Sequence, residues 1–296
     1  MSADNVKLRS RAIVLPGRGG EMSAWEMGPQ DQPIDLIFSH ANGFNGRTYR
    51  AIVEPLAVRF RILLLDQRGH GRSRLPANAS IPRKSWNDLV DDLGAALEAL
   101  DARDVVLAGH SMGGTVSTMT AAAARERVRG LVLLDPVILP PAVILQGDDP
   151  PDSPLVAGAQ RRRAQFPDLA SVIAAYTGRG AFRNWTADML ADYVADGFHP
   201  TSDGQVGLTC TPAWEASGFM SSSNDPWPAF DVLQMPMHIL RAEAGSTCRI
   251  EGHEARVLSG GRVRLETIPG TSHFLPMERP DLVRDALREM LETTTR

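Results

Sequence analysis

The chain has 296 residues, a formal net charge of −4 and a hydrophobic share of 43%, which is ordinary for a globular protein. This balance excludes a basic nucleic-acid-binding domain, and no run approaches the roughly 18 apolar residues of a membrane span. The one basic cluster, Arg161-Arg162-Arg163, is interpreted as the solvated face of a helix rather than a phosphate site.

Two cysteines, Cys210 and Cys248, are too few for a disulfide scaffold. Free thiols are typical of a reducing compartment. The first residues also lack the apolar core of a secretory signal peptide. A cytoplasmic protein is therefore expected.

In the first half of the chain, short apolar runs alternate with helical patterns. The runs at 34–38, 61–65, 104–108 and 130–134 predict strands, and the patterns at 89–100 and 115–125 predict helices. The runs are rich in Val, Ile and Leu without strict alternation, which is typical of strands buried on both faces of a sheet. Strand–helix alternation of this kind predicts a parallel sheet with right-handed crossovers.

After Asp135 the rhythm changes to proline-containing, mainly helical sequence. The predicted elements of this half are helices at 161–176, 186–196 and 281–292 and strands at 237–240 and 263–268. We therefore predict a helical cap, residues 138–230, inserted between two strands of one sheet, whose core is formed by residues 1–137 and 231–296. Such a cap must lie at the carboxyl edge of the strands, where open α/β sheets bind ligands.

The strongest local pattern is Gly109-His110-Ser111-Met112-Gly113, between a predicted strand and a predicted helix. In that context G-x-S-x-G is a sharp turn that lifts the serine hydroxyl above the sheet. Glycine is favoured at the flanks because neighbouring backbone comes close. The pattern predicts Ser111 as a nucleophile, with the Met112 amide as one oxyanion donor at the helix N-terminus.

A serine nucleophile needs a base, and the chain offers seven histidines. His273 lies in the loop between the last predicted strand and the final helix, so it can reach the same sheet edge as Ser111. The other six are either in strand-end turns (His40, His70 and His110) or without a surrounding motif (His199, His238 and His253). We predict His273 as the base.

A second oxyanion donor is expected from the loop after an earlier strand. The segment Ser39-His40-Ala41-Asn42-Gly43-Phe44 leaves the first predicted parallel strand, and its Asn-Gly pair is a strong turn signal. We predict the Asn42 backbone N–H as this donor.

These motifs together resemble the α/β-hydrolase superfamily, specifically an esterase-like branch with a helical cap. The matching segments are His40–Gly43, Asp66-Gln67-Arg68-Gly69-His70-Gly71-Arg72-Ser73, Gly109–Gly114 and Gly270-Thr271-Ser272-His273-Phe274. They occur in the superfamily's order and cover nearly the whole chain outside the cap. The resemblance implies a mostly parallel central sheet flanked by helices, the cap, and the roles of Ser111 and His273. It also implies that Asp66 to Ser73 is a structural corner.

The sequence departs from the superfamily pattern at the acid that would complete a catalytic triad with Ser111 and His273. The superfamily usually has an aspartate shortly after the strand that follows the cap, where this chain has Gly245. Asp135, at a strand end before Pro136, is the favoured alternative, because some branches place the acid there and the residue before proline is extended. Glu243, near the end of the next strand, is the rival. The acid's hydrogen bond would hold the tautomer of His273.

The expected function is hydrolysis of a small or medium, fairly apolar ester, thioester or lactone through an acyl-enzyme, with no metal or organic cofactor. The expected roof of the pocket is an aromatic cluster in the cap: Phe166, Tyr176, Phe182, Trp185, Tyr193, Phe198, Trp214, Phe219 and Trp227. A carbon–carbon bond hydrolase or cofactor-free perhydrolase, and a noncatalytic binding relative, remain alternatives. Dehalogenases and epoxide hydrolases resemble this fold but have an aspartate in place of Ser111. The expected partner is a small molecule, with neither nucleic acid nor membrane, and a homodimer is left open.

Overall fold

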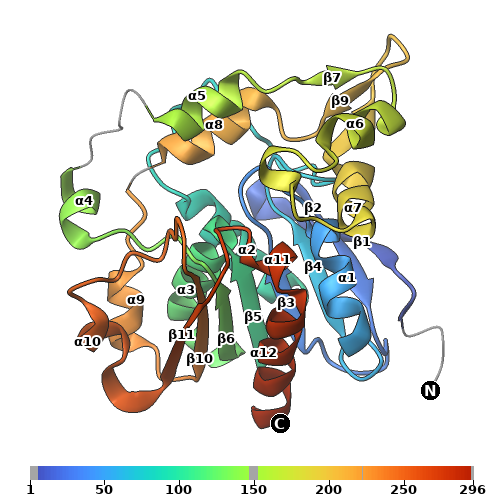
Figure 1. The fold of residues 1–296 in the computed structure, drawn as a ribbon. Helices are drawn as coiled ribbons and strands as arrows, with labels where there is room; N and C mark the ends of the chain where they lie inside the picture. The colour runs from blue at the N-terminus through green and yellow to red at the C-terminus, as the bar shows by residue number, and fades with distance from the viewer. Residues whose placement is uncertain (1–5, 147–152, 222, 295–296) are drawn as a thin grey trace.

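The computed structural model describes residues 6–146, 153–221 and 223–294. At its centre is an eight-stranded sheet in the order β1-β2-β4-β3-β5-β6-β10-β11 (Figure 1). The six strands from β4 to β11 in this order are parallel, whereas β1 and β2 are antiparallel to each other and β2 is antiparallel to β4. The prediction of a mostly parallel central sheet is confirmed.

Each apolar run that predicted a strand forms one, within a few residues of the expected bounds. The strands are β1 (Arg9–Leu15), β2 (Gly20–Met27), β3 (Leu36–Ser39), β4 (Ile62–Asp66), β5 (Val105–His110), β6 (Val128–Leu134), β10 (Met237–Ala242) and β11 (Val263–Ile268). The hairpin of β1 and β2 was not predicted; it extends the sheet at one edge.

Helices cover both faces of the sheet. They are α1 (Arg50–Val53), α2 (Asn87–Ala99), α3 (Met112–Ala123), α9 (Trp227–Val232), α10 (Glu254–Val257), α11 (Leu275–Glu278) and α12 (Pro280–Thr293). Side chains of the central strands alternate between two buried clusters: Leu131 and Leu133 of β6 pack with α2 and α3, whereas Val132 and Leu134 pack with α1 and α12. This period of two explains why central strands such as β6 are apolar at successive positions.

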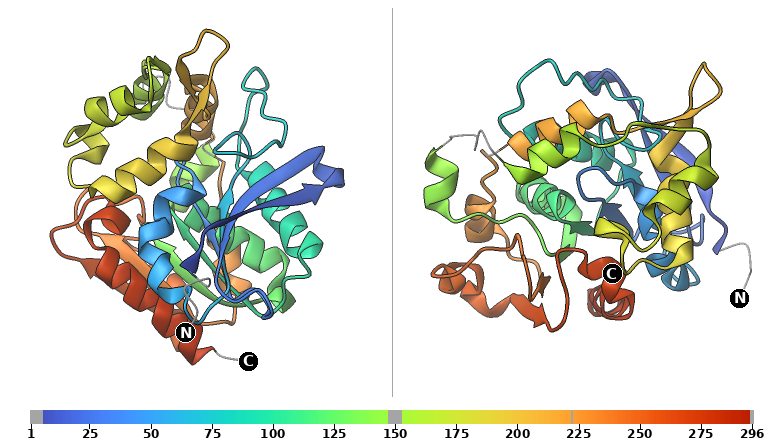
Figure 2. Two further views of the ribbon diagram at one scale, coloured as in Figure 1. Left: turned by 90° about the vertical axis from the view of Figure 1, so that its right-hand side faces the viewer. Right: turned by 45° about the horizontal axis from the view of Figure 1, so that its top comes forward.

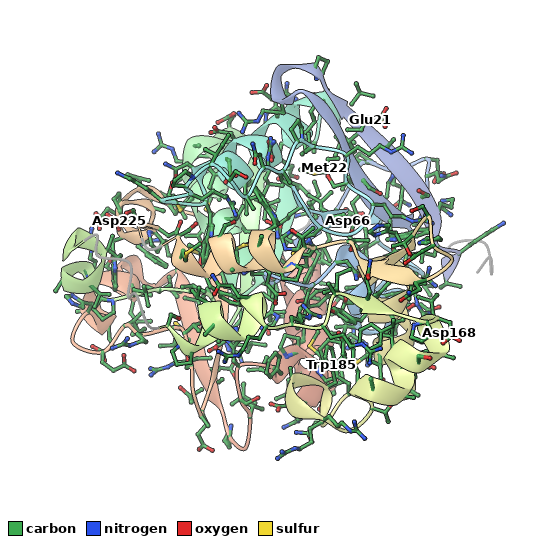
Figure 3. All side chains as sticks on the ribbon, turned by 90° about the horizontal axis from the view of Figure 1, so that it is seen from above. Glu21, Met22, Asp66, Asp168, Trp185 and Asp225 are labelled. Carbon is green, nitrogen blue, oxygen red and sulfur yellow. The ribbon has the colours of Figure 1, made fainter. Side chains whose placement is uncertain are left out.

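Most of the described elements between β6 and β10 form a layer over the sheet, whereas the first and last helices of this segment lie beside it (Figures 1 and 2). The elements of this segment are α4 (Pro141–Gln146), α5 (Pro154–Gln160), β7 (Gln165–Phe166), α6 (Leu169–Tyr176), α7 (Ala187–Gly197), β8 (Phe198–Pro200), β9 (Val206–Leu208) and α8 (Pro212–Met220), followed by α9. Figure 3 shows this layer from above, with α5 and α8 side by side.

Of the two helices expected in this segment, one differs from the structure. The helix predicted at 161–176 is wrong in its first half, because Gln165–Phe166 pairs with β9 in a small sheet β7-β9-β8. Helix α6 begins only after Pro167, where the Asp168 side chain accepts a hydrogen bond from the Ser171 N–H. The helix predicted at 186–196 is α7.

The last helix of the predicted cap, α9, packs into the main core through Trp227 and Phe230. The division into a core and a cap over 138–230 therefore remains a proposal, and residues 147–152 and 222 of that cap lie outside the described residues. Within the described ranges, no helix combines the length and apolarity that crossing a membrane would require.

Candidate active site

Ser111 lies at the turn between β5 and α3, with a backbone φ of 55°. A positive φ is costly for a residue with a side chain, so the turn is held by its surroundings. A Cβ atom on Gly113 would lie 2.2 Å from the Ser39 carbonyl oxygen, and one on Gly109 would lie 2.3 Å from the Gly113 carbonyl carbon. The two flanking glycines are therefore required by close backbone contact.

Three side chains from separate loops meet above the carboxyl edge of the sheet. The His273 Nε2 atom lies 3.0 Å from the Ser111 Oγ atom, and its Nδ1 atom lies 2.7 Å from the Asp135 Oδ2 atom. Asp135 follows β6, and His273 lies between β11 and α11. The geometry is that of a nucleophile, a base and an acid that orients the base.

Asp135 is fully buried and accepts hydrogen bonds from several donors besides His273. Its Oδ1 atom accepts from the Ala242 N–H at 2.9 Å and the Ser246 hydroxyl at 2.5 Å, and its Oδ2 atom accepts from the Thr247 N–H at 3.1 Å. Burial raises the pKa of this carboxyl, but the hydrogen bonds from His273 and Ser246 outweigh it and hold the pKa below its ordinary value. Asp135 is therefore an anion.

The rival carboxylate, Glu243, does not reach the histidine. Its side chain is exposed and accepts a hydrogen bond from the Gly270 N–H at 2.9 Å. Gly245, where an aspartate was expected by resemblance, is also exposed, with φ of 62°. The loop after β10 instead supplies Ser246 and Thr247 as donors to Asp135.

The two amides predicted as oxyanion donors are the backbone N–H groups of Met112 and Asn42. Among the described residues, no acceptor takes a hydrogen bond from the backbone N–H of Met112 or Asn42. The Asn42 side chain donates to the Glu215 carbonyl oxygen at 2.8 Å, which anchors the turn. Met112 directly follows Ser111 and Asn42 lies in the loop after β3, and the role of both amides in catalysis remains a proposal.

Two buried histidines hold the loop that carries Asn42. The His40 Nε2 atom accepts from the Gln67 N–H, and the His70 Nε2 atom accepts from the Gly43 N–H, both at 3.0 Å. Burial lowers the pKa of His40 to about 4 and that of His70 well below its usual value, so both rings are neutral acceptors.

A cluster of aromatic side chains packs next to His273. The Phe44 ring lies 5.3 Å from Trp185, 5.8 Å from Tyr193 and 6.3 Å from Phe274 between centroids. Not all of the aromatic residues expected in a pocket roof lie here: Trp227 is in the main core, and Trp214 donates its Nε1–H to the Arg68 carbonyl oxygen.

Arg162 differs from its predicted place on a solvated helix face. Its guanidinium lies 2.7 Å from the Glu215 carboxylate and donates to the Tyr193 hydroxyl, and its side chain is only 18% exposed. Nearby, a Cβ atom on Gly43 would lie 2.4 Å from a Glu215 carboxylate oxygen. The ion pair thus packs against the turn that carries Asn42 and Gly43, and its charges neutralise each other.

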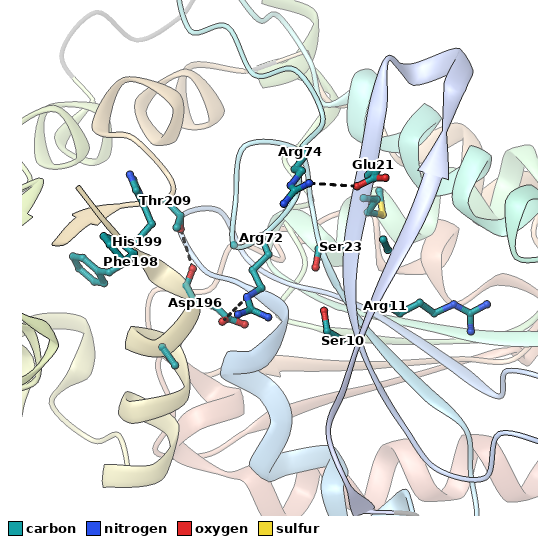
Figure 4. Close-up of a pocket in the computed structure, with 15 residues that line it drawn as sticks. Ser10, Arg11, Glu21, Ser23, Arg72, Arg74, Asp196, Phe198, His199 and Thr209 are labelled. Carbon is teal, nitrogen blue, oxygen red and sulfur yellow. Dashed lines mark hydrogen bonds and ion pairs between the residues drawn. The ribbon is translucent and has the colours of Figure 1, made fainter. Parts of the chain in front are cut away.

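Two cavities differ in their relation to these residues. One of about 660 Å³ lies between the β1–β2 hairpin and the end of α7, and none of Ser111, Asp135 and His273 lines it (Figure 4). Its arginines are paired, Arg72 with Asp196 at 3.3 Å and Arg74 with Glu21 at 3.9 Å.

The second cavity, of about 360 Å³, is lined by Trp185 and by Ser272 and Phe274, the two neighbours of His273. Ser111, Asp135 and His273 do not line this cavity either, but it contacts the loop that carries His273. No cluster of three His, Cys, Asp or Glu side chains suited to a metal ion occurs in the described part of the chain, and both cysteines are free thiols.

Known proteins resemble this chain along most of its length. It is 25% identical over 261 residues to 2-(acetamidomethylene)succinate hydrolase of Mesorhizobium japonicum, with 87% of each chain covered. The crystal structure of E-2-(acetamidomethylene)succinate hydrolase matches with a TM-score of 0.78 and 25% identity, covering 97% of this chain and 100% of that one. A thioesterase domain from the curacin biosynthetic pathway shares the fold, with a TM-score of 0.72, 17% identity and coverage of 95% and 99%.

The family model described as the alpha/beta hydrolase family matches residues 36–286, which is most of the chain. The matched range begins at β3 and includes Ser111, Asp135 and His273. The chain therefore belongs to the alpha/beta hydrolase family and is a hydrolase.

Proposed function

We propose that the protein is a serine hydrolase that cleaves a small or medium, fairly apolar ester, thioester or lactone through an acyl-enzyme on Ser111. The observation that carries this proposal is the hydrogen-bonded series from Ser111 Oγ through His273 to Asp135, with distances of 3.0 and 2.7 Å. A serine hydroxyl is activated by such an arrangement and is otherwise a weak nucleophile.

The proposed reaction has two acyl-transfer steps. His273 Nε2 takes the Ser111 proton as the oxygen attacks the carbonyl carbon, and the amides of Met112 and Asn42 stabilise the oxyanion. The leaving group takes the proton from His273 as its bond to the carbonyl carbon breaks. Water, deprotonated by His273, then releases the acid and restores the serine. Asp135 remains ionised and stabilises the imidazolium in both steps.

The surroundings support an apolar acyl or leaving group. Phe44, Phe274 and Trp185 form a continuous aromatic surface next to the base, and such surfaces line most small-molecule pockets. The relative named 2-(acetamidomethylene)succinate hydrolase acts, by its name, on an acetamido compound, so acetamides belong among the substrates to be tested.

The test is a substrate panel with stopped-flow kinetics. We expect p-nitrophenyl esters of short and medium acyl chains to give a burst of nitrophenol equal to the enzyme concentration if deacylation limits turnover, and Ser111→Ala to lose hydrolysis by about 10⁶-fold. Cleavage of β-diketones but not esters would favour the carbon–carbon hydrolase. Unchanged ester hydrolysis by Ser111→Ala would refute the proposal.

A further inference from the structure

A buried chain of hydrogen bonds connects three loops at the carboxyl edge of the sheet, outside the three residues proposed for the chemistry. The Ala41 N–H donates to the Tyr49 hydroxyl oxygen at 3.3 Å, and that hydroxyl lies 2.8 Å from the His110 Nδ1 atom. On the other side of the ring, His110 Nε2 lies 2.8 Å from the His273 carbonyl oxygen. Tyr49 and His110 are both fully buried.

The donor and the acceptor of each hydrogen bond in this series follow from the chemistry of the groups. The His273 carbonyl oxygen can only accept, so His110 Nε2 must carry the proton. Burial and the neighbouring His273 ring lower the pKa of His110, so the ring is neutral and its Nδ1 atom has no proton. The Tyr49 hydroxyl must therefore donate to Nδ1, which leaves its oxygen to accept from Ala41.

This series of hydrogen bonds connects backbone segments whose relative positions matter for catalysis. Ala41 precedes the proposed oxyanion donor Asn42, His110 precedes Ser111, and the last acceptor is the backbone of the base itself. The ends of β3, β5 and β11 lie at one edge of the sheet (Figure 1), although the three segments are far apart in the sequence. Misplacement of about 1 Å in such a site costs roughly 100-fold in rate.

We propose that Tyr49 and His110 are positioning residues, which use this buried hydrogen-bond chain to hold the backbone of His273 and the Ala41–Asn42 turn in reactive geometry around Ser111. The proposal rests on the proposed function, because reactive geometry has meaning only for a catalytic Ser111. The hydrogen bonds of the Tyr49 and His110 side chains go to each other, to Ala41 and to His273 rather than to Ser111 Oγ, so each residue acts through a neighbour.

Three variants separate positioning from core filling. Tyr49→Phe keeps the ring, which packs against Phe38 at 4.4 Å, and removes only the hydroxyl. His110→Gln can keep a donor for the His273 carbonyl oxygen, whereas His110→Leu fills the space without one. The matched control is Thr120→Val, which removes a buried hydroxyl that donates to the Val90 carbonyl oxygen between α2 and α3.

The readouts are steady-state kinetics on the best ester of the panel, the rate of fluorophosphonate labelling, the melting temperature, and the downfield proton resonance of the bond from His273 to Asp135. We expect Tyr49→Phe and His110→Leu to lower kcat by roughly 10- to 100-fold with KM within about twofold, and to shift or broaden that resonance. His110→Gln should recover at least a third of the wild-type kcat, and Thr120→Val should keep the kcat and the resonance of the wild type.

Wild-type kcat and resonance in Tyr49→Phe and His110→Leu would overturn the inference, as would equal loss in the Gln and Leu variants. If wild-type protein neither hydrolyses esters nor reacts with the fluorophosphonate, the proposed function fails instead. The resonance then still tests whether the chain holds His273, because it does not depend on turnover.

Discussion

Replacement of Asp135 by asparagine tests the assignment of the acid with almost no change in volume. The carboxylate accepts at both oxygens: Oδ1 takes the Ala242 N–H, and Oδ2 takes the Thr247 N–H and the His273 Nδ1–H. An asparagine has only one accepting oxygen. Whichever way its amide is turned, its NH₂ group faces a backbone N–H that cannot rotate away.

The two amide orientations harm the enzyme differently. With NH₂ toward His273, the imidazole must accept at Nδ1, so Nε2 carries the proton and cannot take one from Ser111. With NH₂ toward Ala242, the histidine keeps its tautomer but the imidazolium loses its counter-charge. In a well-characterised Ser-His-Asp triad, the change of Asp to Asn gives the wrong histidine tautomer, as in the first orientation here, and lowers kcat about 10⁴-fold. This loss corresponds to about 5.4 kcal/mol. We expect a loss of 10³- to 10⁴-fold for Asp135→Asn.

The assay is kcat for the best p-nitrophenyl ester, measured for Asp135→Asn beside the matched carboxylate variant Glu243→Gln. Glu243 is exposed and bonded only to the Gly270 N–H among described partners, so its variant should remain within about twofold of wild type. Circular dichroism and melting temperature check the fold of both. A larger loss in Glu243→Gln than in Asp135→Asn would refute the reasoning.

Three further predictions concern stability. Burial lowers the pKa of His40 from 6.5 to about 4, so the contribution of its neutral ring to the free energy of unfolding is fully present above pH 6.5. About 3 kcal/mol of that contribution is lost as the pH falls toward 4. In urea titrations across this range, the free energy of unfolding should therefore depend less steeply on pH in His40→Gln than in the wild type. Gly113→Ala should destabilise by roughly 1–3 kcal/mol because its Cβ meets backbone, whereas Gly94→Ala in open space on α2 should stabilise by about 1 kcal/mol; equal melting temperatures would contradict this. Glu215→Gln should cost roughly 2 kcal/mol in chemical denaturation because it leaves the buried Arg162 charge without its partner, and no change would show that the pair contributes nothing.

The parts of the fold that were predictable are those with local causes. The buried strands are apolar at successive positions because both faces are covered, and the turn at Ser111 is marked by two glycines that backbone contact requires. The strands β7, β8 and β9 have only two or three residues each, too few for a periodic pattern. Their pairing is decided by tertiary contact.

The candidate site was predictable to the extent that motifs mark it. Asp135 and Glu243 both end strands that neighbour the base, so sequence alone left them open; the donors at Ser246 and Thr247, which separate them, lie more than a hundred residues from Asp135. Arg162 was misplaced because a basic run suggests solvent, whereas its partner Glu215 is distant in sequence. The link of His110 to Tyr49 has no sequence signal at all.

The most direct measurement is the site and stoichiometry of covalent labelling by a fluorophosphonate, read by intact-protein mass and peptide mapping. A hydroxyl activated by His273 predicts one adduct per chain, located on Ser111, with none in Ser111→Ala and much slower labelling in His273→Ala. An adduct on another residue, or one that persists in folded Ser111→Ala, would contradict the assignment of the nucleophile.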